Sequence, residues 1–187
     1  MALMIWSYCV DVIFIGNLSQ LNYLDLSYNS INGTLPNSIY QLSDLQVLNL
    51  DKNLLQGTLS YAIQQIYKLQ YLDLRLNNFY GTIPSSIGNL SELTYLRLSV
   101  NAFSGKIPDS IRFLTSLNLF YVSANQLTGT IPNWIGELRS LSYLSLEANQ
   151  LTGTIPTSLF VLSNLIALGL SFNPLTGTLP SVMVEMP

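Results

Sequence analysis

The side chains with potential for catalysis are three aspartates, Asp25, Asp51 and Asp73, which are predicted to share one face of the fold. Two carboxylates on one face can in principle hydrolyse a glycosidic bond. We expect a shallow surface here, however, and arginine partners that keep Asp51 and Asp73 ionised. The sequence contains no histidine, no phosphate-binding glycine loop and no kinase motif. We therefore predict that the chain is not an enzyme and uses no cofactor.

The composition favours packing over chemistry. The chain has 187 residues, of which 49% are hydrophobic and 9% are charged, and its net charge is −3. It offers no basic surface, so nucleic acid is not an expected partner. Cys9 is the single cysteine, which excludes an intrachain disulfide, and no metal site is predicted. No uninterrupted apolar run is long enough for a transmembrane helix.

A strict internal repeat organises the sequence. An asparagine recurs every 24 residues without an insertion, and a glycine follows each one by four residues. Seven such copies fill residues 18–185, which is typical of solenoids whose stacked units bury one continuous core. The asparagines are Asn29, Asn53, Asn77, Asn101, Asn125, Asn149 and Asn173.

Each copy has the same apolar pattern. The alternation at Leu96 and Leu98 predicts a short strand, and Ser85 to Leu90 is predicted to form a short helical segment among turns. A buried asparagine amide must find partners, so we expect each repeated asparagine to bond backbone groups of its own turn and of the neighbouring unit. These asparagines are predicted to form a structural ladder.

The units resemble plant-type leucine-rich repeats. Two of them, LTYLRLSVNAFSGKIPDSIRFL (Leu93–Leu114) and LSYLSLEANQLTGTIPTSLFVL (Leu141–Leu162), follow the family pattern LxxLxLxxNxLxGxIPxxIGxL. The resemblance implies an α/β repeat fold: a right-handed leucine-rich-repeat solenoid of seven 24-residue units, with a parallel sheet on the concave face. It also implies a second, shorter strand in each LxGxIP segment. Family members are chiefly ectodomains of receptor-like kinases and receptor-like proteins, together with secreted polygalacturonase-inhibiting proteins.

The two ends of the chain depart from the repeat. Residues 1–17 are predicted to be a non-repeat segment, either a degenerate signal peptide or a truncated cap, although a basic start and a clear cleavage site are missing. Residues 18–187 are predicted to be the solenoid, truncated inside an eighth unit. The resemblance implies a paired-cysteine cap where this chain has only Cys9. We therefore expect a fragment of a longer protein, with both core ends open to water and poor solubility alone.

The concave face is the predicted binding surface. Each copy is expected to expose four side chains there, at positions −6, −4, −2 and −1 from its asparagine; these 28 positions hold seven of the 17 charged residues. Tyrosines beside charges are typical of interaction hot spots. The predicted ligand-binding residues are Tyr23, Asp25, Tyr28, Asp51, Lys52, Tyr71, Asp73, Arg75, Tyr95, Arg97, Tyr121, Tyr143, Glu147 and Phe172.

Within this surface, the preferred contact patch is Arg75, Arg97, Tyr95 and Tyr121. The 24-residue spacing lets Asp51 meet Arg75 and Asp73 meet Arg97, so the alternative is a self-neutralising lattice that binds nothing. The fifth copy departs from the pattern, with Phe120 in the core and Leu119 expected outside.

Three asparagines, Asn17, Asn32 and Asn89, begin N-x-[ST] sequons and are candidate glycosylation sites off the concave strands. The same tripeptide belongs to the repeat pattern, so chance occurrence is the alternative.

The resemblance implies a recognition module from a plant cell-surface receptor-like protein or kinase, acting in defence or developmental signalling. We expect it to bind a peptide, hormone or pathogen-derived ligand, or a coreceptor ectodomain. It is expected outside the cell or at the plasma membrane, reaching the membrane only through a transmembrane segment of a longer protein. Two alternatives stay open: a secreted enzyme inhibitor resembling the polygalacturonase-inhibiting proteins, and a scaffold without a ligand.

Overall fold

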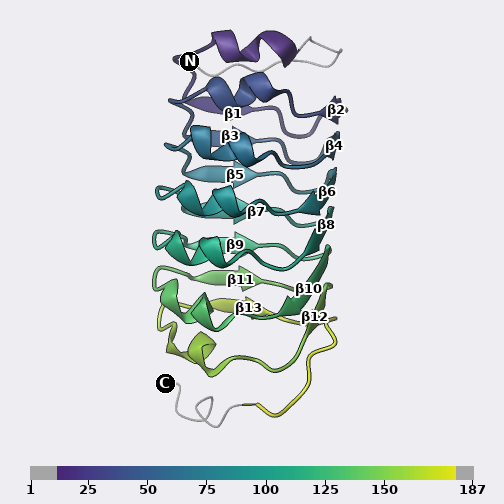
Figure 1. The fold of residues 1–187 in the computed structure, drawn as a ribbon, viewed down its shortest axis with the longest axis vertical. Helices are drawn as coiled ribbons and strands as arrows, with labels where there is room; N and C mark the ends of the chain where they lie inside the picture. Colours follow the sequence, from purple (N-terminus) through teal and green to yellow (C-terminus); the bar gives the residue numbers. More distant parts are fainter. Residues whose placement is uncertain (1–11, 180–187) are drawn as a thin grey trace.

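The computed structural model describes residues 12–179, which wind into a solenoid with the 24-residue units stacked along its long axis (Figure 1). Each neighbouring pair of strands is parallel, as the right-handed winding of successive units requires. The first sheet has seven strands in chain order: β1 (Tyr23–Asp25), β3 (Val47–Asn49), β5 (Tyr71–Asp73), β7 (Tyr95–Arg97), β9 (Leu119–Tyr121), β11 (Tyr143–Ser145) and β13 (Ala167–Gly169).

A second parallel sheet runs beside the first and confirms a second strand in the LxGxIP segments of six units (Figure 1). These strands have three to five residues, so the expectation that they are shorter than the three-residue strands of the first sheet is wrong. The seventh unit contributes only a bridge between Gly153 and Leu175. The repeated glycine lies in or next to these strands with a positive φ, 75° at Gly105 and 93° at Gly57, a conformation that glycine adopts without steric cost. The six strands are β2 (Asn32–Thr34), β4 (Leu54–Gly57), β6 (Asn78–Thr82), β8 (Ala102–Gly105), β10 (Gln126–Thr130) and β12 (Gln150–Thr152).

Short 3-10 helices connect the second sheet of one unit to the first sheet of the next. The predicted helical segment at 85–90 is one of them, but within residues 12–179 every helix is of the 3-10 type and none is α. A proline with φ between −64° and −72° begins five of them, and Ser60 replaces it at η3, where its hydroxyl accepts a hydrogen bond from the Ala62 amide. The helices are η1 (Val12–Asn17), η2 (Asn37–Gln41), η3 (Tyr61–Gln65), η4 (Ser85–Asn89), η5 (Asp109–Phe113), η6 (Asn133–Glu137) and η7 (Thr157–Val161).

The first helix lies in the segment predicted as non-repeat. Residues 12–17 form η1, which stacks on η2 and so occupies the helical position of a repeat unit (Figure 1). The remainder of that segment, including Cys9, lies outside the described residues. At the other end, Ile166, Leu168 and Phe172 of the last described unit are exposed.

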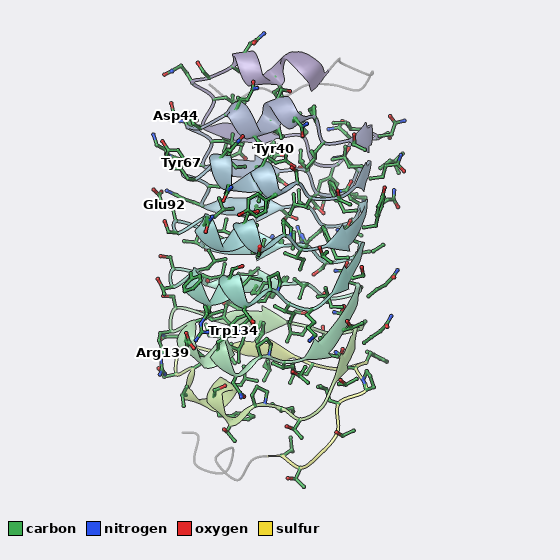
Figure 2. All side chains as sticks on the ribbon, viewed as in Figure 1. Tyr40, Asp44, Tyr67, Glu92, Trp134 and Arg139 are labelled. Carbon is green, nitrogen blue, oxygen red and sulfur yellow. The ribbon has the colours of Figure 1, made fainter. Side chains whose placement is uncertain are left out.

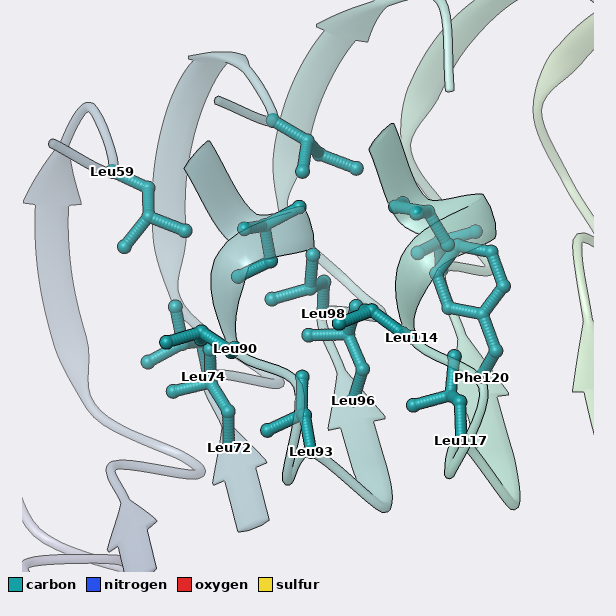
Figure 3. Close-up of a cluster of buried hydrophobic side chains, with 14 of the residues drawn as sticks. Leu59, Leu72, Leu74, Leu90, Leu93, Leu96, Leu98, Leu114, Leu117 and Phe120 are labelled. Carbon is teal, nitrogen blue, oxygen red and sulfur yellow. The ribbon is translucent and has the colours of Figure 1, made fainter. Parts of the chain in front are cut away.

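The core fills the space between the sheets and the helices. Figure 3 shows Leu72, Leu74, Leu96 and Leu98 projecting from two neighbouring strands of the first sheet into this space, where all four are fully buried. Alternation explains the arrangement, because the residue between each leucine pair points to the opposite face of the sheet. In the fifth unit Phe120 is in the core as expected.

Leu119 lies outside the core cluster, as expected, but its side chain is only 6% exposed. The strand register places Leu119 between Tyr95 and Tyr143, whose larger side chains stand on either side of it and cover it.

The asparagine ladder is confirmed. Asn125 donates to the carbonyl oxygens of Val122 in its own turn, at 3.1 Å, and of Leu98 in the preceding unit, at 3.0 Å. Its own side-chain oxygen accepts from the Phe103 amide at 2.9 Å. The same bonds recur from Asn53 to Asn173, which explains why no unit can gain or lose a residue here.

Several of the remaining charges follow the edge where the helices turn into the first sheet. Figure 2 shows Asp44, Tyr67 and Glu92 along this edge, in successive units. Lys68 pairs with Asp44 at 2.7 Å across one repeat, and both side chains are well exposed. Such exposed pairs contribute little to stability.

Candidate ligand-binding face

The outward face of the first sheet, together with the residues just after each strand, carries all fourteen predicted site residues; we call it the strand face. Neighbouring parallel strands bring equivalent positions of successive units together, so that Tyr71 lies opposite Tyr95 and Asp73 opposite Arg97. Tyr23, Tyr28, Lys52, Tyr95 and Phe172 are exposed. The half-buried members are Asp25, Tyr71, Arg75, Arg97, Tyr121, Tyr143 and Glu147.

Two of the predicted contact residues are not accessible. Asp73 is 0% exposed and Asp51 is 3% exposed, so the prediction that they meet a ligand directly is wrong. The reason is that arginine side chains lie over them. The Nε of Arg75 donates to both oxygens of Asp73, at 2.9 and 3.0 Å, and its Nη2 lies 3.4 Å from Asp51.

Both predicted ion pairs between neighbouring units form. Arg97 Nη1 lies 3.6 Å from Asp73, and the Tyr71 hydroxyl donates to the same carboxylate at 3.1 Å. Burial raises the pKa of Asp51 above its ordinary value, even though Arg75 opposes the shift. The arginine thus stabilises the charge of Asp51 less completely than expected. Two acids and two bases close into one neutral cluster.

Aromatic rings cover one side of this cluster. The rings of Tyr71 and Tyr95 are tilted by 46° with their centres 5.7 Å apart. The Arg97 guanidinium lies 5.5 Å from the centre of the Tyr71 ring, within range of a cation–π interaction. Of the preferred contact patch, Arg97 is therefore held by the cluster itself, whereas Tyr95 remains exposed.

A hollow of about 500 Å³ opens on the strand face beside the cluster. Arg75, Tyr121 and Glu147 line this hollow, Glu147 from a unit closer to the C-terminus. The sequence prediction thus identified three of its polar residues. The other lining residues are Leu76, Ser99, Val100, Ser123, Leu144, Ser145, Ala167, Leu168 and Gly169.

The residue before each repeated asparagine has a left-handed backbone. Val100 has a φ of 58° and Leu76 a φ of 52°, and both side chains are partly exposed at the hollow. This conformation is unfavourable for bulky residues and most unfavourable for a β-branched one. The same conformation recurs in every unit, so it belongs to the turn of the repeat. The full set is Tyr28, Lys52, Leu76, Val100, Ala124, Ala148 and Phe172.

At the N-terminal end of the strand face, Asp25 is held by neutral donors. The Ser27 amide donates to it at 2.8 Å and the Asn49 side chain at 3.0 Å. Burial raises the pKa of Asp25, but these hydrogen bonds together outweigh it and the pKa lies below its ordinary value. Lys52 lies nearby over the ring of Tyr28, 4.9 Å from its centre.

A second regular surface was missed in the sequence. The position after each repeated glycine holds an exposed threonine in six of seven units, and Lys106 in the other. In five of these threonines the methyl packs over the glycine of the next unit; the Thr82 methyl lies 2.9 Å from where a Cβ on Gly105 would be. The fixed spacing of these residues could have revealed this threonine column, which comprises Thr34, Thr58, Thr82, Thr130, Thr154 and Thr178.

The three sequon asparagines, Asn17, Asn32 and Asn89, are exposed and lie off the strand face, as expected. Glycosylation itself stays a prediction. Within residues 12–179 no group of three His, Cys, Asp or Glu side chains could hold a metal ion. That same stretch contains no helix of the length and apolar character needed to cross a membrane.

Comparison with known proteins supports this geometry. The family described as "Leucine-rich repeat region" matches residues 55–186, and "Leucine rich repeat" matches residues 10–55. No curated protein sequence matches the chain.

Among solved structures, the plant peptide hormone receptor RGFR1 in complex with RGF2 has 37% identity and a TM-score of 0.88, over 90% of this chain and 27% of that one. The ectodomain of the Arabidopsis thaliana receptor kinase GASSHO1/SCHENGEN3, in complex with CASPARIAN STRIP INTEGRITY FACTOR 2, has 40% identity and a TM-score of 0.87, over 91% and 21%. A plant ice-binding protein has 27% identity and a TM-score of 0.65, over 89% and 69%.

This chain therefore spans about a quarter of the length of the receptor ectodomains that it matches. Over most of its own length the chain superposes on these structures with TM-scores of 0.87 and 0.88. The chain belongs to the leucine-rich repeat family.

Proposed function

We propose that this chain is a peptide-recognition section of a plant cell-surface receptor ectodomain, and that it binds without catalysing a reaction. The observation that carries the proposal is the hollow on the strand face, where Tyr121 and partly exposed Leu76 and Val100 stand beside serine hydroxyls and two charged groups. Apolar walls with a few polar groups are typical of ligand sites. An extended peptide has apolar side chains that can contact such walls and polar groups that can bond to such charges and hydroxyls.

The similarity to receptor structures that contain peptide ligands supports this function. Those proteins are membrane-receptor ectodomains, so we place this chain outside the cell as part of a longer protein. A hormone, a pathogen-derived peptide and a coreceptor segment all fit this description. Asp51 and Asp73 are both paired with arginine, so these two aspartates are not free to act as a pair of glycosidase carboxylates.

The test is selection from a synthetic peptide library. The full chain, immobilised through a terminal tag, is incubated with capped octapeptides, and bound peptides are resynthesised for calorimetry. We expect binders whose affinity falls about tenfold or more in Tyr121→Ala, because tyrosine is a frequent hot-spot residue. The matched control is Tyr61→Ala, which removes an exposed tyrosine from η3.

Unchanged peptide affinity in Tyr121→Ala would show that the peptide binds outside the hollow. Failure to select any peptide would refute peptide recognition. Inhibition of a polygalacturonase by the same preparation would then favour the secreted-inhibitor alternative, and no binding at all would favour a scaffold.

A second candidate function, ice binding, is favoured by the threonine column. Its methyl and hydroxyl groups are exposed on a parallel sheet, where neighbouring strands are about 4.8 Å apart. Contact with the glycines below restricts the side chains, so the column presents a regular array of donors, acceptors and methyl groups to water. The plant ice-binding protein shares the fold at 27% identity.

Inhibition of ice recrystallisation tests this function. We expect activity in the natural chain and its loss in a Thr58→Lys, Thr82→Lys double variant, because two lysines break the array. Lys106 already occupies the column, so lysine is compatible with folding there. Thr115→Lys, an exposed threonine outside the second sheet, is the control. An inactive natural chain would exclude this function.

A further inference from the structure

Glu147 is the one carboxylate of the hollow without a basic partner. Arg75, at the other end, is occupied by Asp51 and Asp73. Within residues 12–179 the ion pairs leave Glu147 out, although it is half-buried on the strand face. A partly desolvated carboxylate in such a setting favours a cation brought from outside.

The structure holds this carboxylate in place. Ser171 Oγ donates to Glu147 Oε1 at 2.7 Å, and Ser145 Oγ lies 3.3 Å from Oε2. These bonds use part of the acceptor capacity of a carboxylate, which has about four lone-pair positions, so room remains for further donors. The Glu147 carboxylate is therefore held in a fixed position and can still accept further hydrogen bonds.

Gly169 makes this position possible. A Cβ on Gly169 would lie 2.7 Å from the carboxyl carbon of Glu147 and 3.0 Å from Oε2. In the other units the equivalent position carries a side chain, for example Arg97 or Tyr121. Only at the last strand, β13, is that side chain missing, and the carboxylate of the preceding unit occupies the space.

The surroundings suit a long aliphatic stem that ends in a charge. Ala167, which is exposed, lies on the strand next to Glu147, and Tyr121 and Val100 continue the hollow toward the N-terminus. Ser99 is occupied by Ser123, which donates to it through its backbone amide and its hydroxyl. The hollow thus combines apolar walls with a single free acid.

We propose that the hollow is a subsite for a basic side chain, lysine or arginine, of an extended peptide, with the cation on Glu147 and the stem against Ala167 and Tyr121. The proposal rests on peptide recognition by the strand face and specifies its chemistry. Lysine and arginine commonly bury their methylenes along apolar surface while the charged group finds a partner. A guanidinium can bond both carboxylate oxygens, so we expect arginine to be preferred.

The peptide selection described above also tests the subsite. We expect selected octapeptides to share a lysine or arginine at one aligned position, and to bind Glu147→Gln about tenfold more weakly than the natural chain. Glu92→Gln makes the same charge change at the helix edge and should bind normally. Gly169→Ala should also weaken basic peptides, because its methyl displaces the carboxylate. Matching far-ultraviolet spectra and unfolding midpoints for natural chain and Glu147→Gln exclude a folding defect.

The outcomes separate the two claims. Selected peptides without a shared basic residue, or basic peptides that bind Glu147→Gln as tightly as the natural chain, would refute the basic subsite and leave peptide recognition standing. Absence of any selected peptide would refute both. Restoration of binding to Glu147→Gln by peptides with glutamine in place of the basic residue would support direct contact at this position.

Discussion

The Arg75 guanidinium encloses the carboxylate of Asp73, with Nε at 2.9 and 3.0 Å from its two oxygens and Nη2 at 2.8 Å from Oδ2. Both residues belong to one unit, and the backbone amide of Arg75 donates to the same carboxylate at 3.1 Å. Because Asp73 is completely buried, this contact has a structural role before any role in binding.

Arg75→Ala should therefore destabilise the fold by about 3 kcal/mol, because it leaves a buried carboxylate with only the more distant Arg97 as its cation. Urea unfolding followed by circular dichroism measures the change. Adding Asp73→Asn to Arg75→Ala should recover part of the loss. Arg112→Ala, which breaks an exposed pair with Glu137, is the control and should leave the midpoint nearly unchanged. A loss in Arg75→Ala no larger than in this control would contradict the buried role.

Asp25 should stabilise the folded chain at neutral pH. Its folded pKa lies below the ordinary value of 3.8, so its contribution is fully present above that value and is lost as the pH falls through the folded pKa. Asp25→Asn should be less stable than the natural chain at pH 6, and the difference should vanish in acid. Urea midpoints between pH 2 and 6 measure it. A constant difference across this range would show that the charge is not responsible.

Asp51 should behave in the opposite sense. Its folded pKa is raised, chiefly by burial, so the ionised form is disfavoured in the folded state and stability falls as the pH rises from 3.8 through the folded pKa. Asp51→Asn should remove this dependence, so its stability at neutral pH, relative to its stability in acid, should be higher than in the natural chain. The same midpoints, compared with those of Asp25→Asn, check the sign. If the urea midpoints of the natural chain and of Asp51→Asn changed equally with pH, the raised pKa of Asp51 would be contradicted.

The ladder predicts that the cost of losing an asparagine depends on its place in the stack. Asn125→Ala removes hydrogen bonds to two units and leaves buried backbone groups unsatisfied, so we expect a loss of about 3 kcal/mol. Asn29→Ala removes bonds to Leu26 and Ser27 of its own turn, and about 1 kcal/mol is expected. Calorimetric unfolding compares the two, and equal losses would mean that the contacts between units carry little energy.

Val100 offers a test of strain at the hollow. Asparagine tolerates the left-handed backbone that valine occupies at a φ of 58°, so Val100→Asn should stabilise the fold by about 1 kcal/mol. Ala124→Asn, at the equivalent position with a φ of 51°, replaces a smaller residue and should gain less. Peptide affinity should fall in Val100→Asn, because its methyl groups line the hollow. If Val100→Asn bound peptide normally, the strained backbone at this position would affect folding but not binding.

Much of the fold follows from the linear pattern. A constant 24-residue interval permits stacking in one register, and the alternation at Leu96 and Leu98 assigns one face of each strand to the core. The helical type does not follow, because a five-residue segment after a proline is compatible with both 3-10 and α geometry. The 24-residue spacing also predicts that Asp51 lies beside Arg75, but it does not predict how deeply Asp51 is buried.

The repeat, the asparagine ladder and the residues that share the strand face could be predicted from the amino-acid sequence, because they depend on the repeat interval and on residue polarity. The accessibility of those residues could not be predicted in this way. Asp73 is buried because Arg75 and Tyr71 lie over it, whereas Glu147 stays open because Gly169, one unit later, has no side chain. Accessibility depends on the size and direction of neighbours in adjacent units, and these are fixed only when the units stack.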